Sequence, residues 1–417
     1  MRIPLASSGL RPKDIQAAKL VLESQNYTMG AKVKEFEESV AKYLGSKYFV
    51  MVNSGSSANL IIFEALLRPS SNTPKLSLGD GVLVPAVAWP TTIWPIIQLG
   101  LEPIFIDVDP NTLAIDLQLA QQKIDTVGET KPIKAIFPIH PLGYCIDHNL
   151  LDSFCKKNNL IQLNDVCESL GSKRGSLHAG TTGLASSYSF YFSHHITTME
   201  GGGVATNDLD LADDLRAMRS HGWSRDRSDV INWKNKYSSA LTTRGISENQ
   251  LKFQFVTTGY NLRPMEIQAA IGIEQLKDLD NFVTKRRNIA KHIRNSLMDT
   301  VFEVIDGGTL EITELEKSHS WMFICIRVKK LMSQETRKNL DVLLEHFEIE
   351  SRPALTGNFL DQPVMRQMYG ESESMKFQVA QLVSSNYFMV SSHHELSDEQ
   401  IDYLGTSLRS ISIKLFE

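Results

Sequence analysis

Short apolar runs bounded by turn residues recur through the first half of the chain, as buried strands do. Segments with apolar residues at helical spacing lie between several of them. This alternation predicts a largely parallel sheet covered by helices on both faces, which is a large α/β domain. The predicted strands are Tyr48–Val52, Val82–Val84, Pro103–Ile106, Ile133–Pro138, Leu160–Leu163, Ser187–Tyr191 and Val204–Ala205. The predicted helices between them are Ser57–Leu67, Leu117–Ile124, Asn149–Asn158 and Leu209–Ser220.

Helical patterns flank this region on both sides. Pro12–Ser24 and Ala31–Leu44 precede it, and a long run of helix formers, Met265–Leu297, follows it with a soft break around Asp278–Asp280. That run carries the chain into a smaller α+β domain. Its predicted strands are Phe323–Val328, Glu350–Arg352 and Phe388–Val390, and its predicted helices are Ser333–His346 and Glu399–Ile411. We therefore expect a large domain over residues 1–280 and a smaller C-terminal domain over residues 281–417.

Composition and charge fit an ordinary globular protein with two domains. The 417 residues are 42% hydrophobic and 22% charged, with a net charge of -5, so we expect no binding to nucleic acid or to an anionic membrane. The uncharged stretch Gly81–Leu101 approaches the length of a membrane span, but Pro85, Pro90 and Pro95 would interrupt a spanning helix. The N-terminal residues lack a secretory apolar core, and we expect a cytoplasmic protein.

Small residues open one of the predicted helices directly after a strand. In Ser54-Gly55-Ser56-Ser57-Ala58 the backbone N–H groups and the positive end of the helix face whatever lies there. A phosphate group fits this arrangement, and the hydroxyl of Ser189 could bind the same phosphate. Many such turns cap a helix without any ligand, so the pattern alone leaves both interpretations open.

Asp165 follows the predicted strand Leu160–Leu163, at the carboxyl end where open α/β sheets place their ligands. A carboxylate at that point can pair with a pyridinium nitrogen and keep it protonated. The alternative is that Asp165 only caps the following helix.

The segment Ser189–His195, followed by Met199–Gly203, resembles the cofactor-anchoring stretch of the DegT/DnrJ/EryC1/StrS family of sugar aminotransferases. Asn164–Gly171 and Gly259–Pro264 resemble two further motifs of the same family. Its pattern places a lysine five residues after the serine, to hold pyridoxal phosphate covalently, but here that position is His194. No lysine occurs between residues 173 and 234 that could replace it. The resemblance implies a fold type I pyridoxal-phosphate enzyme, with a mostly parallel central sheet.

The resemblance also implies roles for particular residues. The cofactor would be pyridoxal 5'-phosphate or pyridoxamine 5'-phosphate, with Asp165 at its pyridinium nitrogen and Trp89 stacked on its ring. Glu168 stands where transaminating relatives carry glutamine or histidine. Asn261 would reach the phosphate of the neighbouring subunit, so a homodimer with a shared active site is expected. The expected cofactor-binding residues are Gly55, Ser56, Trp89, Asp165, Glu168, Ser189 and Asn261.

Replacing the lysine by His194 changes the implied reaction. An imidazole cannot hold the cofactor covalently, but it can accept a proton and later donate it. Together with the motifs Arg352-Pro353, Gly357-Asn358-Phe359 and His393-His394, which resemble those of one branch of the family, this histidine implies a pyridoxamine-phosphate-dependent dehydratase. Such an enzyme is a lyase that removes the C3 hydroxyl of a nucleotide-linked 4-keto-6-deoxyhexose. The expected substrate is GDP-4-keto-6-deoxymannose, and L-glutamate would regenerate the amine form of the cofactor.

Three further residues are candidates for substrate binding. Arg352 can hold a phosphate group through two hydrogen bonds, although a surface ion pair would explain it equally well. Asn358 lies in the tight turn that follows. We expect His195 to support His194, because neighbouring side chains on an extended segment point to opposite faces, which also argues against a metal site at this pair. The segment Asp226–Asn249 is a further candidate for selecting the nucleotide or sugar.

Three other functions are disfavoured by particular residues of the sequence. A relative with the same histidine carries an iron–sulfur cluster and works with a reductase, but its cluster needs cysteines after the histidine segment, and none lies between Cys167 and Cys325. No iron–sulfur reductase partner is therefore expected. An ordinary sugar aminotransferase is disfavoured by His194. A catalytically silent binding or regulatory protein is disfavoured because Asp165, Ser189 and Asn261 are all present.

Overall fold

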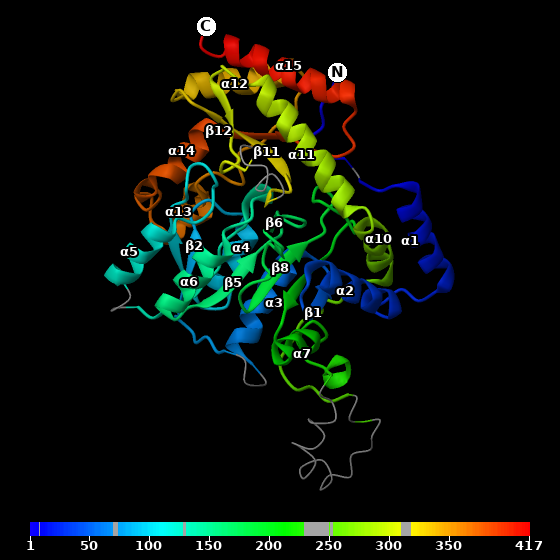
Figure 1. Ribbon diagram of the computed structural model, residues 1–417. Coiled ribbons are helices and arrows are strands. Elements are labelled where there is room, and N and C mark those ends of the chain that lie inside the picture. Colours follow the sequence, from blue (N-terminus) through cyan, green and yellow to red (C-terminus); the bar gives the residue numbers. More distant parts are fainter. Residues whose placement is uncertain (8, 70–73, 128–130, 229–249, 251–252, 310–317) are drawn as a thin grey trace.

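The computed structural model describes residues 1–417 except 8, 70–73, 128–130, 229–249, 251–252 and 310–317. Its centre is a seven-stranded sheet in the order β1-β9-β8-β5-β4-β2-β3 (Figure 1). Only β9 runs antiparallel to its neighbours, so the prediction of a largely parallel sheet is confirmed. The strands are β1 (Tyr48–Val52), β2 (Gly81–Pro85), β3 (Glu102–Ile106), β4 (Ile133–Ile136), β5 (Ile161–Asp165), β8 (Ala185–Ser189) and β9 (Gly202–Thr206).

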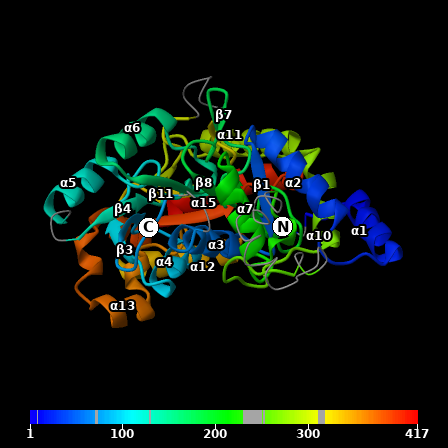
Figure 2. The same cartoon turned by 90° about the horizontal axis from the view of Figure 1, so that it is seen from below.

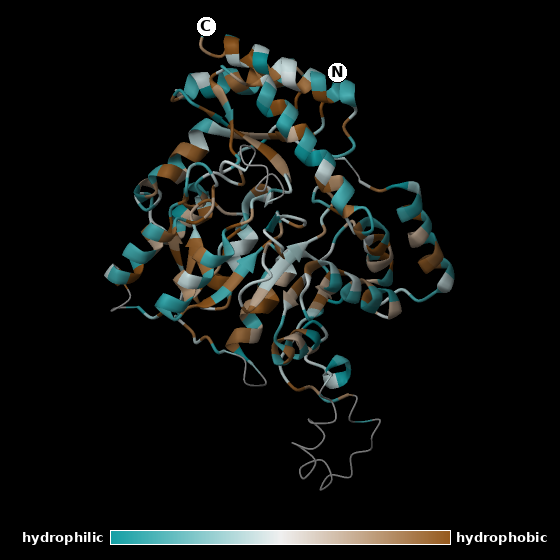
Figure 3. Cartoon of the chain, in the orientation of Figure 1, coloured by the Kyte–Doolittle hydropathy of each residue, from teal (hydrophilic) through white to brown (hydrophobic). Residues whose placement is uncertain are grey.

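Alternate residues of these strands pack on opposite faces of the sheet. Val82 and Val84 of β2 contact the core beneath α3, α4 and α7, whereas Leu83 packs with α5 and α6. At the other end of the sheet, α2 and α10 cover the second face. Figure 2 shows helices on both sides of the sheet, and Figure 3 shows that several of its strands are hydrophobic (brown). These helices are α2 (Ala31–Leu44), α3 (Gly55–Leu67), α4 (Pro90–Gln98), α5 (Leu117–Val127), α6 (His148–Asn158), α7 (Leu209–Met218) and α10 (Glu266–Leu276).

A carboxylate from α10 completes the N-terminal end of α2. Glu266 is 5% exposed and accepts hydrogen bonds from the backbone N–H groups of Gly30 (2.8 Å), Lys32 (2.9 Å) and Val33 (2.9 Å). The positive end of α2 favours this negative charge. The contact therefore ties a helix near the N-terminus to one that lies more than two hundred residues later.

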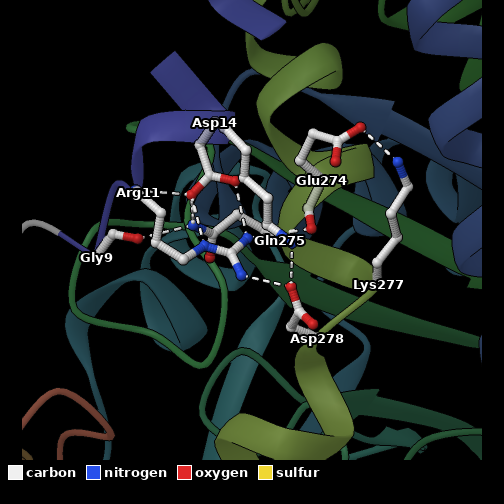
Figure 4. Close-up of polar contacts among 8 residues, drawn as sticks. Gly9, Arg11, Asp14, Glu274, Gln275, Lys277 and Asp278 are labelled. Atoms are coloured by element: carbon white, nitrogen blue, oxygen red, sulfur yellow. Dashed lines mark hydrogen bonds and ion pairs between the residues drawn. The ribbon is translucent and has the colours of Figure 1, made fainter. Parts of the chain in front are cut away.

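The segment before α1 (Pro12–Ser24) docks at the junction of α10 and α11, as Figure 4 shows. Arg11 pairs with Asp14 (Nη2–Oδ1, 2.8 Å) and with Asp278 (Nη1–Oδ2, 2.5 Å). Gln275 donates a further hydrogen bond to Asp14 (Nε2–Oδ2, 2.6 Å). Asp14 is completely buried, and these donors replace the water that its carboxylate loses.

A three-stranded antiparallel sheet carries the second core of the molecule, against α11, α12 and α15. The N-terminal segment joins it, because Ile3 pairs with Ile349 and the N-terminus lies beside α15 (Figure 1). The strands and helices of this C-terminal part are β10 (Phe302–Val304), β11 (Phe323–Val328), β12 (Tyr387–Ser391), α11 (Leu279–Ser296), α12 (Gln334–His346), α13 (Pro363–Tyr369), α14 (Gln378–Asn386) and α15 (Asp398–Lys414). Of these, α13 and α14 pack against the core of the large sheet, through Met365, Ala380 and Val383. The shorter elements are β6 (Lys173–Arg174), β7 (Leu177–His178), η1 (Pro141–Gly143), η2 (Ser224–Asp226), η4 (Phe359–Asp361) and η5 (Ser374–Lys376).

Most predicted elements are confirmed, and α1, α2, β1 and β11 have the predicted bounds. The predicted strand Glu350–Arg352 is wrong: Arg352 forms only an isolated bridge with Met389, and Pro353, which follows, has no N–H to extend the pairing. The division at residues 280 and 281 stays a prediction. Within the described ranges, no helix is long and apolar enough to cross a membrane.

Candidate active site

A cavity of about 380 Å³ opens at the carboxyl ends of β5 and β8, beside the N-terminal end of α3. Residues far apart in the sequence line it, from the large sheet, from the loop after β8 and from the segment around residue 352. It brings together eight of the predicted site residues: Gly55, Ser56, Trp89, Asp165, Glu168, Ser189, His194 and Arg352. It also includes Ser193, Thr92, Cys167, Glu200, Met322 and Leu355, which the sequence did not single out as site residues.

The N-terminal end of α3 approaches β8 closely because Gly55 has no side chain. A Cβ atom on Gly55 would lie 2.5 Å from the Cβ of Ser189. Ser54 caps the helix by accepting a hydrogen bond from the N–H of Ser57 (3.1 Å). The backbone N–H groups of the first turn and the hydroxyl of Ser189 thus lie at one wall of the cavity, where a phosphate would be favoured.

Asp165 ends β5 and is 4% exposed. Its Oδ2 accepts hydrogen bonds from Asn59 (2.9 Å) and from the hydroxyl of Thr92 (2.8 Å). Its Oδ1 accepts from the N–H of Cys167 (3.1 Å). Three donors fix the orientation of this carboxylate at the cavity wall, so its position does not depend on a ligand.

Glu168 lies in the turn after β5 and contacts the cavity with a nearly buried carboxyl group. Burial raises the pKa of Glu168 to about 7, while the N–H of Leu142 (2.9 Å) and the charge of Arg352 oppose this rise. Near neutral pH the group therefore exists in both protonation states. It can donate a hydrogen bond as well as accept one.

His194 lies in the loop after β8, and its imidazole lines the cavity. The ring Nδ1 is buried and has no hydrogen-bond partner among the described residues. Burial lowers the pKa of His194 to about 4, and the charges of Arg352 and Arg286 lower it further, against the backbone groups of Ser189 and Cys167. The imidazole is therefore neutral at pH 7 and able to accept a proton.

Arg352 and Trp89 face the same cavity from other elements. The guanidinium of Arg352 lies 4.7 Å from the ring centroid of Phe323, and its Nε is buried without an acceptor in the described structure. Burial lowers the pKa of Arg352, and Glu168 opposes that shift. Trp89 precedes α4 and is 46% exposed at the mouth of the cavity. Both side chains thus have surface left for a ligand.

Three predicted site residues, His195, Asn358 and Asn261, lie outside this cavity. The Nε2 of His195 faces the carbonyl of Ser320 (3.2 Å), so this ring points into the protein. Asn358 is completely buried, where it donates to the carbonyl of Ser374 (2.9 Å) and caps the short helix η4. Its contacts are structural within this chain. Of the segment Asp226–Asn249, a candidate for substrate selection, residues 229–249 lie outside the described residues.

Asn261 also lies apart from the cavity of its own chain. Its Oδ1 accepts a hydrogen bond from the Nε of Arg263 (3.0 Å), and its backbone pairs with Ser220. The adjacent Leu262 carbonyl accepts from the N–H of Asn53 (3.0 Å), which holds this loop near the start of α3.

Asn59 and Thr92, the donors to Asp165, have no local signal in the sequence. Asn59 lies one helical turn after Gly55 and Thr92 lies in the first turn of α4, so only the fold brings them to one carboxylate. The four cysteines form no disulfide, and no cluster of three metal-ligating side chains occurs in the described part of the chain. The expectation that no iron–sulfur partner is needed stays a prediction.

The raised pKa of Glu168 can be tested through the pH dependence of the free energy of unfolding. Between the ordinary carboxyl pKa and about 7 the folded protein binds a proton that the unfolded chain has released, so stability falls as pH rises through this window. We expect Glu168→Gln to remove a decline on the order of 3 kcal/mol in the free energy of unfolding between pH 4.5 and 7.5. Urea unfolding of the cofactor-free protein measures it. The exposed control Glu38→Gln should keep the wild-type slope, and an equal slope in Glu168→Gln would show that the carboxyl is not perturbed.

Comparison with known proteins extends over nearly the whole chain. The model of the DegT/DnrJ/EryC1/StrS aminotransferase family matches residues 9–409. GDP-4-keto-6-deoxy-D-mannose 3-dehydratase of Escherichia coli O55:H7 is 37% identical over 407 residues, covering 97% of this chain and 99% of the relative. The enzyme of that name from Yersinia pseudotuberculosis is 36% identical over 411 residues, covering 98% of each chain.

Solved structures agree with the sequence comparison. A crystal structure of a histidine-to-asparagine variant of GDP-4-keto-6-deoxymannose-3-dehydratase with bound GDP-perosamine superposes with a TM-score of 0.84 at 36% identity, covering 98% of this chain and 100% of that one. Another, with a trapped PLP-glutamate geminal diamine, has a TM-score of 0.83 at 34% identity and the same coverage. The chain belongs to the DegT/DnrJ/EryC1/StrS aminotransferase family.

Proposed function

We propose that this protein is a pyridoxamine-phosphate-dependent 3-dehydratase of GDP-4-keto-6-deoxymannose. The observation that carries the proposal is the neutral imidazole of His194 in a cavity whose described lining contains no lysine. In the net reaction the ketosugar and L-glutamate give the 3-deoxy-4-ketosugar, 2-oxoglutarate and ammonia. The oxygen leaves as water from C3, and glutamate supplies the two electrons.

The residues of the cavity fit the expected cofactor. The first-turn N–H groups at Gly55 and Ser56, with the Ser189 hydroxyl, form a cradle for its phosphate. Asp165 offers a carboxylate that is already oriented for a pyridinium nitrogen, and Trp89 offers an exposed ring for stacking. When bound, the cofactor supplies an electron sink that stabilises negative charge on the carbon next to its nitrogen.

His194 then moves the proton. Its neutral ring would accept a proton from the carbon next to the cofactor's nitrogen. The same ring would then donate a proton to the C3 hydroxyl of the sugar as that group leaves. Anionic phosphates in the cavity would raise the pKa of the imidazole from about 4 toward neutrality, which suits a group that acts first as base and then as acid. Arg352 is placed to bind an anionic group of the substrate.

The test is mass spectrometry of GDP-4-keto-6-deoxymannose incubated with the protein, pyridoxal phosphate and L-glutamate, with ammonia and 2-oxoglutarate followed in the same tube. We expect loss of one oxygen from the sugar, with one ammonia and one 2-oxoglutarate per sugar consumed. An amino sugar without ammonia release would identify an aminotransferase instead. If neither product forms and no cofactor binds, the protein is a silent member of the family.

The variant His194→Lys should bind pyridoxal phosphate covalently and lose deoxygenation of the sugar. A lysine amine at this position can hold pyridoxal phosphate covalently, so borohydride treatment should fix the cofactor to the chain, which intact-protein mass spectrometry would detect. Loss of the imidazole should lower the deoxygenation rate by about 100-fold or more. Retained deoxygenation in this variant would remove His194 from the proposed role.

We also propose a homodimer in which Asn261 completes the neighbouring subunit's site. In its own chain Asn261 lies outside the cavity although its loop is anchored beside the start of α3. Exposed apolar side chains surround this region, including Tyr27 (51%) and Met265 (48%), as expected for a surface covered by a second copy. Each cavity would then receive one amide from its partner.

Subunit complementation tests the shared site. Asn261→Ala and His194→Lys homodimers should both be inactive at limiting cofactor, but a mixed dimer contains one site in which both residues are intact. Random reassembly of equal amounts should restore about one quarter of wild-type deoxygenation, because half of the dimers are mixed and each has one working site. No restoration, with mixed dimers demonstrated by mass, would place Asn261 in the site of its own chain.

A further inference from the structure

A buried guanidinium that has no carboxylate partner among the described residues lies behind His194. Arg286, on α11, is only 1% exposed, and its polar contacts within the described structure are all with uncharged groups. Burial lowers the pKa of Arg286 to about 9, and no acidic group counteracts that shift. Burying a charge without a counter-charge lowers the stability of the folded protein. A function that needs the positive charge of Arg286 would explain why it is retained.

The hydrogen bonds of Arg286 join three segments at the back of the cavity. Its Nη2 donates to the carbonyl of His194 (3.3 Å). Its Nη1 donates to the carbonyls of Trp321 (3.2 Å) and Met322 (2.9 Å), just before β11, and to the hydroxyl of Ser392 (3.3 Å), just after β12. One planar group therefore holds the loop of the proposed base against the smaller sheet.

The charge of Arg286 is surrounded by neutral imidazoles. Burial lowers the pKa of His195, His393 and His394, and Arg286 lowers all three further. It acts on His194 in the same direction, behind the effects of burial and of Arg352. The charged and titratable groups around His194 in the described structure are Arg286, Arg352, His195 and Tyr191, with Asp165, Cys167, Glu168 and Glu200 at the same cavity.

We propose that Arg286 is a positioning residue for His194, which holds the main chain of that residue in place and brings a buried positive charge close to it. This inference rests on the proposed role of His194 as the base. A guanidinium performs both tasks because it carries a permanent charge and several fixed donors, whereas a neutral side chain of similar size would only fill the space.

Histidine titration in the cofactor-free protein tests the charge directly and does not depend on the reaction. The Cε1 signal of His194, in protein labelled with ¹³C-histidine, is assigned by its absence from a His194→Asn variant. We expect the wild-type ring to stay neutral down to pH 5. In Arg286→Met the pKa of His194 should rise measurably, by up to about one unit, because a nearby buried cation is removed. Arg286→Lys keeps a charge and should leave the ring neutral.

Activity then separates positioning from folding. Both variants should lose deoxygenation rate through the lost contact with the His194 carbonyl, but only Arg286→Met should shift the acid limb of the pH–rate profile upward. Arg287→Met is the matched control, because Arg287 is the next residue on α11 and donates to the carbonyl of His319 (2.8 Å) instead. If folded Arg286→Met shows the wild-type titration of His194, Arg286 is only structural. Failure of the sugar assay with a shifted titration would overturn the proposed function and leave the effect of the charge on His194 established.

Discussion

The site depends on a close approach of backbone segments at the carboxyl edge of the sheet. A Cβ atom on Gly55 would lie 2.5 Å from the Cβ of Ser189, and one on Gly202 would lie 2.4 Å from the carbonyl carbon of Ser54. Neither contact is possible for a residue with a side chain. Because both positions are glycine, the start of α3 meets the ends of β8 and β9, and its free N–H groups come within the cavity that Asp165 and His194 also line.

Without a lysine to hold the cofactor, the pocket has to be preorganised by noncovalent contacts. Asp165 is oriented by three donors, and Glu168 by the N–H of Leu142, before any ligand is present. Burial then separates the protonation behaviour of Glu168 from that of His194, since it raises the pKa of the Glu168 carboxyl and lowers the pKa of the imidazole. Glu168 and His194 thus line the same cavity in different protonation states, an arrangement suited to acid–base chemistry at neutral pH.

Much of the fold could be predicted because its elements have local signals. The bounds of α1, α2 and β11 follow from their own apolar spacing and flanking turn residues. Eight of the predicted site residues line one cavity, whereas Asn261 and Asn358 lie outside it, because a motif does not state which way a side chain points. His195 lies outside it as well and faces into the protein. Asn59 and Arg286 were missed, since each acts on a residue about a hundred positions away.

The sequence by itself determined the α/β class, the family and the replacement of a lysine by His194, because these depend on residue identity and local periodicity. Only the tertiary structure decided which charges are buried and what compensates them. The neutral imidazole of His194, the partly protonated carboxyl of Glu168 and the lowered pKa of the buried Arg286 all arise from desolvation by elements that are remote in the chain. Desolvation depends on everything packed around a group, and no local pattern of residues records it.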